Sequence, residues 1–248
     1  LPFFLSSRSA RKAGAVLDPE DKRLLVLSGF FLAIHFLSWI ASLSFTGITS
    51  SIVFVTTSPI FIEIYSVAVH RERTSVRVWA GIAVAAAGSA ILAGGNIASG
   101  GAGWKGDLLA VIGAAAVSGY FLVGKRLRPR LPLIGYIFPV YSTAAVLLAL
   151  TAPLMGEPIL GLPLKTYVYC FLMALVCQVA GHSLFNWALS RIKTTLVAMA
   201  TLGEPIGTTL LAWMIIDEVP AGTELIGGAV ILAGVFVVLT GGRGAVRV

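Results

Sequence analysis

Charged residues are scarce in this chain, and cysteine is nearly missing. Only 12% of the 248 residues are Asp, Glu, Lys or Arg, whereas a typical soluble domain has about 25%. The two cysteines, Cys170 and Cys177, lie seven residues apart in one apolar segment, too far apart along a helix for a disulfide. The composition excludes an ordinary soluble globule, and the cysteines say nothing about the redox compartment.

Apolar residues are abundant instead, at 57% of the chain, and the mean hydropathy is +0.93. A bilayer-crossing helix needs about 20 apolar residues, and eight such segments fit. Their apolar runs are continuous, whereas the strands of a membrane β-barrel alternate. We therefore predict an all-α membrane protein with eight transmembrane helices. The predicted spans are residues 24–43, 49–70, 76–95, 107–124, 134–155, 167–190, 194–216 and 222–241.

Turn residues separate these spans. They include Gly94-Gly95-Asn96, Arg128-Pro129-Arg130, Gly156-Glu157-Pro158 and Val219-Pro220-Ala221.

Basic residues are distributed unevenly between the predicted loops. The net charge is +7, but the Lys and Arg residues lie in short runs and form no patch for nucleic acid. When loops are assigned to alternate sides, 16 of the 18 basic residues fall on one side, and only Lys105 and Lys165 fall on the other. Basic loops stay on the cytoplasmic side, so we expect both termini to be cytoplasmic.

An internal repeat links the two halves of the chain. Pro59, Glu72, Gly81, Gly88 and Gly95 recur 146 positions later as Pro205, Glu218, Gly227, Gly234 and Gly241. The first three spans thus correspond to the last three. The shift is five helices, an odd number, so equivalent helices cross the membrane in opposite directions, as in the inverted repeats of secondary transporters. The second copy has five spans, so we expect two further helices before Leu1.

The second copy carries a recognisable set of motifs. They are His182 followed by Asn186-Trp187-Ala188-Leu189-Ser190, then Gly203-Glu204-Pro205, Asp217-Glu218 and the glycines 227, 228 and 234. This set resembles the EamA-type family of the drug/metabolite transporter superfamily. The resemblance implies a ten-helix inner-membrane carrier with two EamA repeats. Ser58-Pro59 departs from the family's Glu-Pro, and the first two helices are missing.

The repeat and the resemblance together suggest three regions. Residues 1–98 are an incomplete first EamA repeat, residues 106–241 are the second repeat, and residues 242–248 are a cytoplasmic tail.

Two acidic residues, Glu63 and Glu204, lie in the interior of predicted spans, away from the span ends. A charged side chain in a membrane is costly and by default marks a functional site. Glu204 is a candidate for binding a substrate ammonium group, and both are candidates for proton coupling. The alternative is a hydrogen-bonded carboxyl group that only packs helices together. The neighbouring Pro59 and Pro205 predict helix kinks.

Polar residues form a stripe in the span 167–190. Gln178, His182 and Asn186 are spaced four apart, on one face of a helix, and His35 and Trp39 hold matching positions in the span 24–43. We predict that these stripes bind substrate, with His182 also a candidate for proton transfer. The alternative is hydrogen bonding between helices. Polar contacts are also expected from Thr201, Tyr120 and Tyr141.

No metal-ligand spacing, phosphate-binding loop or activated nucleophile appears in the sequence, so we expect no metal, no cofactor and no catalytic residues. The expected function is a secondary transporter of small organic metabolites in the lipid bilayer. A truncated, non-transporting scaffold is the alternative, and an intramembrane enzyme is a weaker one. The substrate, the direction and a homodimeric state stay open.

Overall fold

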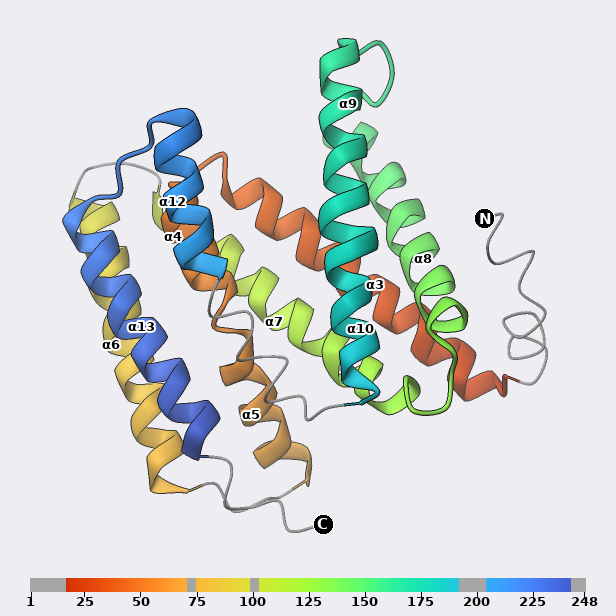
Figure 1. The fold of residues 1–248 in the computed structure, drawn as a ribbon, viewed down its shortest axis with the longest axis horizontal. Coiled ribbons are helices and arrows are strands. Elements are labelled where there is room, and N and C mark those ends of the chain that lie inside the picture. The colour runs from red at the N-terminus through yellow and green to blue at the C-terminus, as the bar shows by residue number, and fades with distance from the viewer. Residues whose placement is uncertain (1–16, 71–74, 99–102, 192–203, 242–248) are drawn as a thin grey trace. The chain divides into compact units, whose positions relative to one another are not determined.

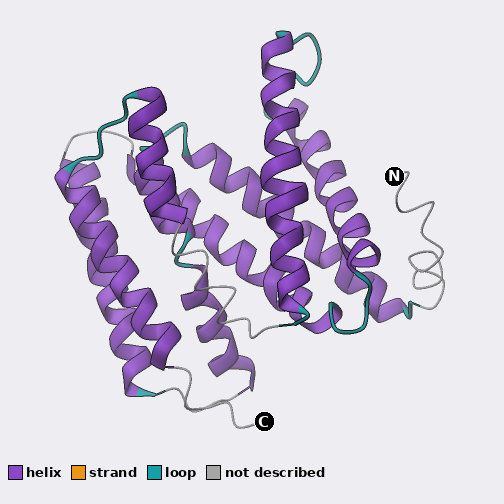
Figure 2. Cartoon of the chain, in the orientation of Figure 1, coloured by secondary structure: helices purple, strands orange, loops and turns teal. Residues whose placement is uncertain are grey.

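The computed structural model describes residues 17–70, 75–98, 103–191 and 204–241. Every regular element in these ranges is helical (Figure 2), which confirms the predicted all-helical fold. The helices are α3 (Pro19–Ser42), α4 (Ile48–Val55), α5 (Ser58–His70), α6 (Val76–Ala98), α7 (Gly103–Leu127), α8 (Leu133–Leu154), α9 (Leu164–Met173), η1 (Ala174–His182), α10 (Ser183–Leu189), α12 (Glu204–Ile216) and α13 (Gly222–Gly241).

Five helical segments within the described residues are long and apolar enough to cross a membrane. They are Pro19–Ser42, Ile48–Tyr65, Gly103–Leu127, Leu133–Leu154 and Leu164–Leu189. Three shorter apolar helices cover Val76–Ile91, Glu204–Ile216 and Gly222–Val238. Together these segments overlap the eight predicted spans, although residues 194–203 of the seventh span lie outside the described residues.

The predicted turn at Gly94-Gly95-Asn96 is wrong, because α6 continues through it to Ala98. A glycine inside a helix costs only about 1 kcal/mol. In a bilayer, interrupting the helix would also leave backbone groups without partners. The predicted turn at Arg128-Pro129-Arg130 does separate α7 from α8.

The predicted single span 49–70 is interrupted, because α4 ends at Val55 and α5 begins at Ser58. Pro59 is the second residue of α5 and has no N–H to continue the hydrogen bonds of α4. At the break, the Thr56 and Thr57 hydroxyls donate to the carbonyls three residues earlier, at 2.9 and 2.6 Å. The hydroxyls thus satisfy backbone groups where the helix stops.

The span 164–189 is not a uniform α-helix. Its central nine residues, Ala174–His182, form the π-helix η1, in which the backbone hydrogen bonds join residues five apart. Gln178 and His182 both lie in this segment. A π-helix has more than four residues per turn, so the four-residue spacing of Gln178 and His182 is less than one turn. The two side chains are therefore rotated about the helix axis relative to their positions in a straight α-helix.

The chain divides into two compact units. Unit 1 comprises residues 1–33 and 119–197, and unit 2 comprises residues 34–118 and 198–248. Each unit combines segments from both halves of the sequence, and each is described by itself below.

Close contacts between helices in unit 1 depend on small residues. A Cβ on Gly29 of α3 would lie 2.5 Å from Cβ of Thr143 in α8, and one on Gly119 of α7 would lie 2.9 Å from the Phe31 ring. Glycine therefore lets these helices meet at backbone distance. The Ser28 and Tyr136 hydroxyls form a hydrogen bond of 2.7 Å between α3 and α8.

In unit 2, α6 and α13 lie side by side along their lengths (Figure 1). A Cβ on Gly81 of α6 would lie 2.8 Å from the carbonyl oxygen of Gly234 in α13. An apolar core fills the interior between α4, α7 and α13. Its buried residues are Val53, Phe54, Val55, Ala110, Ile231 and Val235.

The helix bounds follow the sequence repeat. The start of α6 at Val76 and that of α13 at Gly222 are 146 residues apart, the same separation as the sequence repeat.

Candidate functional site

A group of hydrogen-bonded polar side chains lies within the apolar helices of unit 1. Asn186 of α10 is fully buried, and its Nδ2 donates to the hydroxyl of Tyr120 in α7. The same nitrogen lies 3.5 Å from the hydroxyl of Tyr141 in α8, which in turn lies 3.3 Å from Oγ of Ser183. Three helices thus contribute to one group, which we call the Asn186 cluster: Tyr120, Tyr141, Ser183 and Asn186.

The Asn186 cluster retains hydrogen-bonding capacity. Oδ1 of Asn186 is buried and accepts no hydrogen bond from any described residue. Buried polar atoms in proteins are nearly always paired with protein or with water. This oxygen is therefore the atom in the cluster that is open to a donor from a small molecule.

The cluster lies near one end of its span. Asn186 is three residues before the end of α10 at Leu189, which is about 5 Å at the helical rise of 1.5 Å per residue. That end is the one followed by Arg191, on the side predicted to be cytoplasmic. The predicted polar stripe therefore runs from the middle of the span, at Gln178, to its basic end.

His182 and Gln178 continue from the cluster along η1. The His182 ring lies 6.0 Å from the Tyr120 ring and 6.3 Å, edge to face, from the Phe185 ring. Its carbonyl oxygen accepts a hydrogen bond of 2.7 Å from Nδ2 of Asn186. The Gln178 side-chain oxygen is buried and has no partner among the described residues. The structure thus brings His182 to the cluster and leaves Gln178 two turns from Asn186.

The other predicted stripe, His35 and Trp39, lies in unit 2. Nδ1 of His35 forms a hydrogen bond of 3.0 Å with the carbonyl oxygen of Gly113 in α7. A carbonyl oxygen can only accept, so Nδ1 is the donor. The His35 and Trp39 rings stack with centroids 5.6 Å apart. Trp39 also packs on the apolar core of the unit, while its buried indole N–H has no partner among the described residues. Both residues thus contact α7.

Glu204 is the first described residue of α12, and Pro205, the second, is buried. The Glu204 side chain is half-buried, and no described residue forms a hydrogen bond or an ion pair with its carboxylate. Glu63 lies in the middle of α5 and is also half-buried. Thr201 lies outside the described residues.

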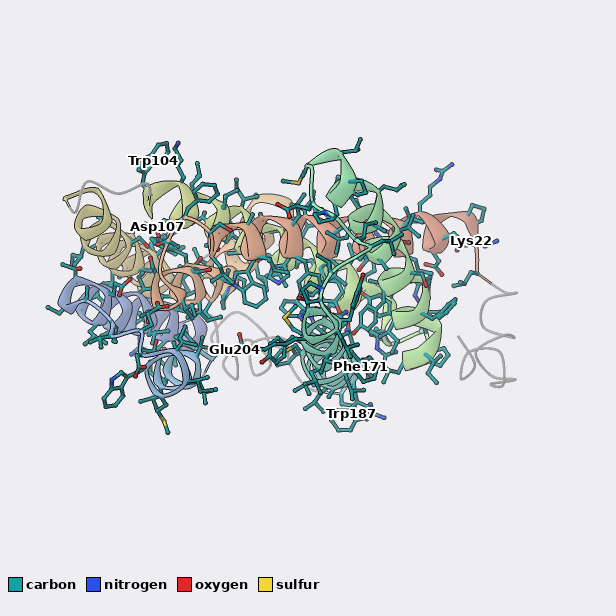
Figure 3. The ribbon with its side chains drawn as sticks, turned by 90° about the horizontal axis from the view of Figure 1, so that it is seen from above. Lys22, Trp104, Asp107, Phe171, Trp187 and Glu204 are labelled. Atoms are coloured by element: carbon teal, nitrogen blue, oxygen red, sulfur yellow. The ribbon has the colours of Figure 1, made fainter. Side chains whose placement is uncertain are left out.

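One intramembrane acid was missed by the sequence analysis. Asp107 of α7 is 3% exposed and lies among the helices of unit 2, whereas Trp104, one turn earlier, projects outward (Figure 3). One oxygen of Asp107 accepts from Thr46 Oγ1 at 2.9 Å and from Ser50 Oγ at 2.7 Å. Asp107 is the first residue of the predicted span 107–124, where an acid resembles an ordinary helix end. The hydroxyl side chains of Thr46, Thr49, Ser50 and Ser51 are the sequence signal that could have indicated a partner.

Glu218 lies between α12 and α13 and contacts the start of α4. Its Oε1 accepts the backbone N–H of Ile48 at 2.7 Å. It therefore caps the start of α4, where backbone N–H groups have no partner within the helix.

No group of three or more His, Cys, Asp or Glu side chains in the described ranges is placed to hold a metal ion.

Eight apolar helical segments with a few hydrogen-bonded polar side chains inside them define a multi-pass membrane protein. The model of the EamA-like transporter family matches residues 1–94 and 104–240. The chain belongs to this family of membrane transporters, and the resemblance of its motifs is confirmed.

Comparison with solved structures supports the same fold. A crystal structure described only as "Crystal structure of protein" has a TM-score of 0.54 and 20% identity, and the match covers 92% of this chain and 89% of that one. No curated protein sequence matches.

Proposed function

We propose that this protein is a secondary transporter that exports small organic metabolites, such as amino acids or related compounds, across the inner membrane. Its two inverted repeats would alternate access to the substrate, with both termini in the cytoplasm. The family membership supports transport, and the unequal distribution of basic residues supports the orientation.

The Asn186 cluster carries the proposal. A buried carboxamide, two tyrosine hydroxyls and a serine hydroxyl from three apolar helices offer neutral hydrogen bonds, and Oδ1 of Asn186 is open to a donor. Polar groups in a membrane interior are costly and usually serve a substrate or ion pathway. A neutral cluster of this kind suits amide, hydroxyl or ammonium groups on a small molecule. His182, in contact with Tyr120, is the aromatic and titratable neighbour of this site.

Proton coupling is assigned to Glu204. Its carboxylate is half-buried in an apolar helix and has no described partner to hold it in one charge state. Pro205 follows directly and has no backbone N–H to donate, like Pro59 at the matching position of the first repeat. Glu63 and His182 are the further candidates for the proton, and His35, Trp39, Gln178 and Thr201 stay predicted substrate contacts.

Transport by purified protein in proteoliposomes tests the proposal. Vesicles are loaded with a panel of amino acids and related metabolites, and efflux is measured with and without an imposed pH gradient. Asn186→Ala should reduce the apparent affinity about 3–10-fold, the value of one hydrogen bond. Glu204→Gln should transport without responding to the gradient.

Glu157→Gln is the matched control, because Glu157 is an exposed carboxylate in the loop after α8. It should behave as wild type in both measurements. An unchanged affinity in Asn186→Ala contradicts the binding assignment. An unchanged gradient response in Glu204→Gln contradicts the coupling assignment. If folded wild-type protein moves no compound of the panel, the non-transporting scaffold is favoured.

A further inference from the structure

The last turn of α7 and the connection to α8 carry three arginines, of which two pair with acids. Arg126 forms an ion pair with Glu20, and Nη2 of Arg130 lies 2.9 Å from Oδ1 of Asp21. Arg128, between them, has no carboxylate partner among the described residues. All three count toward the excess of basic residues on the predicted cytoplasmic side. In the structure, Arg128 differs from the other two because it has no described carboxylate partner.

Arg128 is a buried cation, with 5% of its surface exposed. Its Nε donates to the carbonyl oxygen of Asn186 at 2.9 Å, and Nη1 donates to the carbonyl oxygen of Leu131. These acceptors are neutral, and burying a charge without a counter-charge is unfavourable. Consistent with this, burial lowers the pKa of the Arg128 guanidinium. The charge of Arg128 is therefore solvated by dipoles but not neutralised.

A second guanidinium converges on the same point. Nη2 of Arg128 lies 3.5 Å from Oγ of Ser190, and Nη1 of Arg191 lies 3.3 Å from that oxygen. Arg191 is held over the Trp187 ring, with Cζ 4.3 Å from the ring centroid. Two positive groups thus face one neutral hydroxyl, an arrangement that like-charge repulsion opposes unless an anion lies between them.

These residues line a hollow of about 440 Å³ in unit 1. Its polar side is Arg128, Ser190 and Arg191, and its apolar side is Leu131, Leu133, two prolines and Trp187. Trp187 is 43% exposed and projects outward from its helix (Figure 3). The hollow lies where α7 and α10 end, at the predicted cytoplasmic membrane surface, where exposed tryptophans are common.

We propose that this hollow binds a phosphate group, held by the guanidinium groups of Arg128 and Arg191 and by the Ser190 hydroxyl. Guanidinium forks match phosphate oxygens, and basic pockets at span ends suit anionic lipid headgroups. The phosphate belongs to an anionic phospholipid, whose glycerol and acyl groups lie along the leucines and Trp187, or to a soluble phosphate ester. The site shares no side chain with the proposed transport site, although Arg128 donates to the backbone carbonyl of Asn186, and its test needs no transport measurement.

Thermal unfolding of the purified protein in a neutral detergent tests the site. Phosphatidylglycerol, phosphatidylcholine, glycerol 3-phosphate and inorganic phosphate are titrated separately at constant ionic strength. We expect phosphatidylglycerol to raise Tm saturably, and phosphatidylcholine to have no effect. A saturable rise with the soluble phosphates but not with phosphatidylglycerol supports the site and assigns it to a soluble ligand.

Two variants separate this site from general surface charge. Arg191→Gln should weaken the anion effect about tenfold, the loss expected for a hydrogen bond to a charged group. Arg126→Gln removes the same charge from the same end of the unit but outside the hollow, and it should respond as wild type. Arg128→Lys keeps the charge without the fork and should also weaken binding.

The proposal is overturned if neither kind of phosphate raises the Tm of the wild type. It is also overturned if Arg191→Gln responds as the wild type does, or if Arg126→Gln loses the response equally. Because Arg191 is exposed and lies at a helix end, its replacement keeps the test usable even where Arg128→Lys does not fold.

Discussion

At the scale of single residues, a few buried polar side chains connect several helices. Asn186 joins α7, α8 and α10 through hydrogen bonds to two tyrosines and to its own helix. A polar group in an apolar interior stabilises the fold only while its bonds are made. The side chain whose Oδ1 binds substrate in the proposed function therefore also holds unit 1 together through its Nδ2.

Replacing Asn186 by alanine should destabilise the protein by about 1–2 kcal/mol, because the Tyr120 and Tyr141 hydroxyls lose a partner inside the membrane. Unfolding in mixed SDS and neutral-detergent micelles measures this. Leu184→Ala on the same helix is the control, since Leu184 is 61% exposed. Equal losses in the two variants would mean that the hydrogen bonds add nothing.

Asp107→Ala should cost about 1–3 kcal/mol, because the Thr46 and Ser50 hydroxyls lose the carboxylate oxygen that accepts from both. Asp107→Asn keeps an acceptor oxygen there and should cost less. The same unfolding assay compares them, with the exposed Glu157→Ala as the control. If the asparagine variant is as unstable as the alanine variant, the negative charge and not the acceptor is what matters.

At the scale of elements, the pair α6 and α13 depends on backbone contact. Helices in lipid gain little from apolar burial, and their association relies on close packing at small residues. A Cβ on Gly234 would lie 2.4 Å from the backbone nitrogen of Ala85. Backbone atoms at this distance have no flexible side chain to move aside, so the helices themselves would have to separate.

Gly234→Ala should therefore destabilise unit 2 by about 1–3 kcal/mol, the usual cost of overpacking. Gly207→Ala in α12 is the matched control, because no described atom lies within 4 Å of a Cβ there. It should change stability by less than about 1 kcal/mol. Thermal unfolding of the two variants in one detergent compares them, and an unaffected Gly234→Ala would show that the helix pair adjusts freely.

Two local features of the helices are not predicted by hydropathy. Residues 49–70 are hydrophobic on average in spite of their hydroxyl side chains and Glu63, so hydropathy predicts one helix, whereas the structure has two. The interruption depends on the missing N–H of Pro59 and on the threonine hydroxyls before it. Similarly, the π-helix at Ala174–His182 leaves no mark on the apolar pattern.

At the scale of the whole molecule, the orientation in the membrane rests on the distribution of charge. Lys105 near the start of α7 and Lys165 near the start of α9 are the two basic residues predicted to lie outside the cytoplasm. Lys125 lies near the opposite end of α7. A helix of 25 residues is about 37 Å long, enough to place its ends on opposite membrane faces.

Single cysteines should report this orientation in a variant with Cys170 and Cys177 replaced by serine. Lys105→Cys and Lys165→Cys should react with a membrane-impermeant maleimide in right-side-out vesicles. Lys125→Cys should react only after permeabilisation. Labelling is measured by the mass shift on a gel. The reverse pattern would invert the topology and place the proposed phosphate site outside the cytoplasm.

The sequence by itself determined the helical membrane fold, the repeat and the family, because these follow from apolar length, residue spacing and motifs along one dimension. It also supplied Asn186 and His182 as candidate site residues. The tertiary structure alone decided which polar groups meet. It brought Tyr120 and Tyr141 to Asn186, gave Asp107 its hydroxyl partners, and left Arg128 buried without a counter-charge. Such contacts join residues tens of positions apart, and their strength depends on distance and burial, which a linear pattern does not contain.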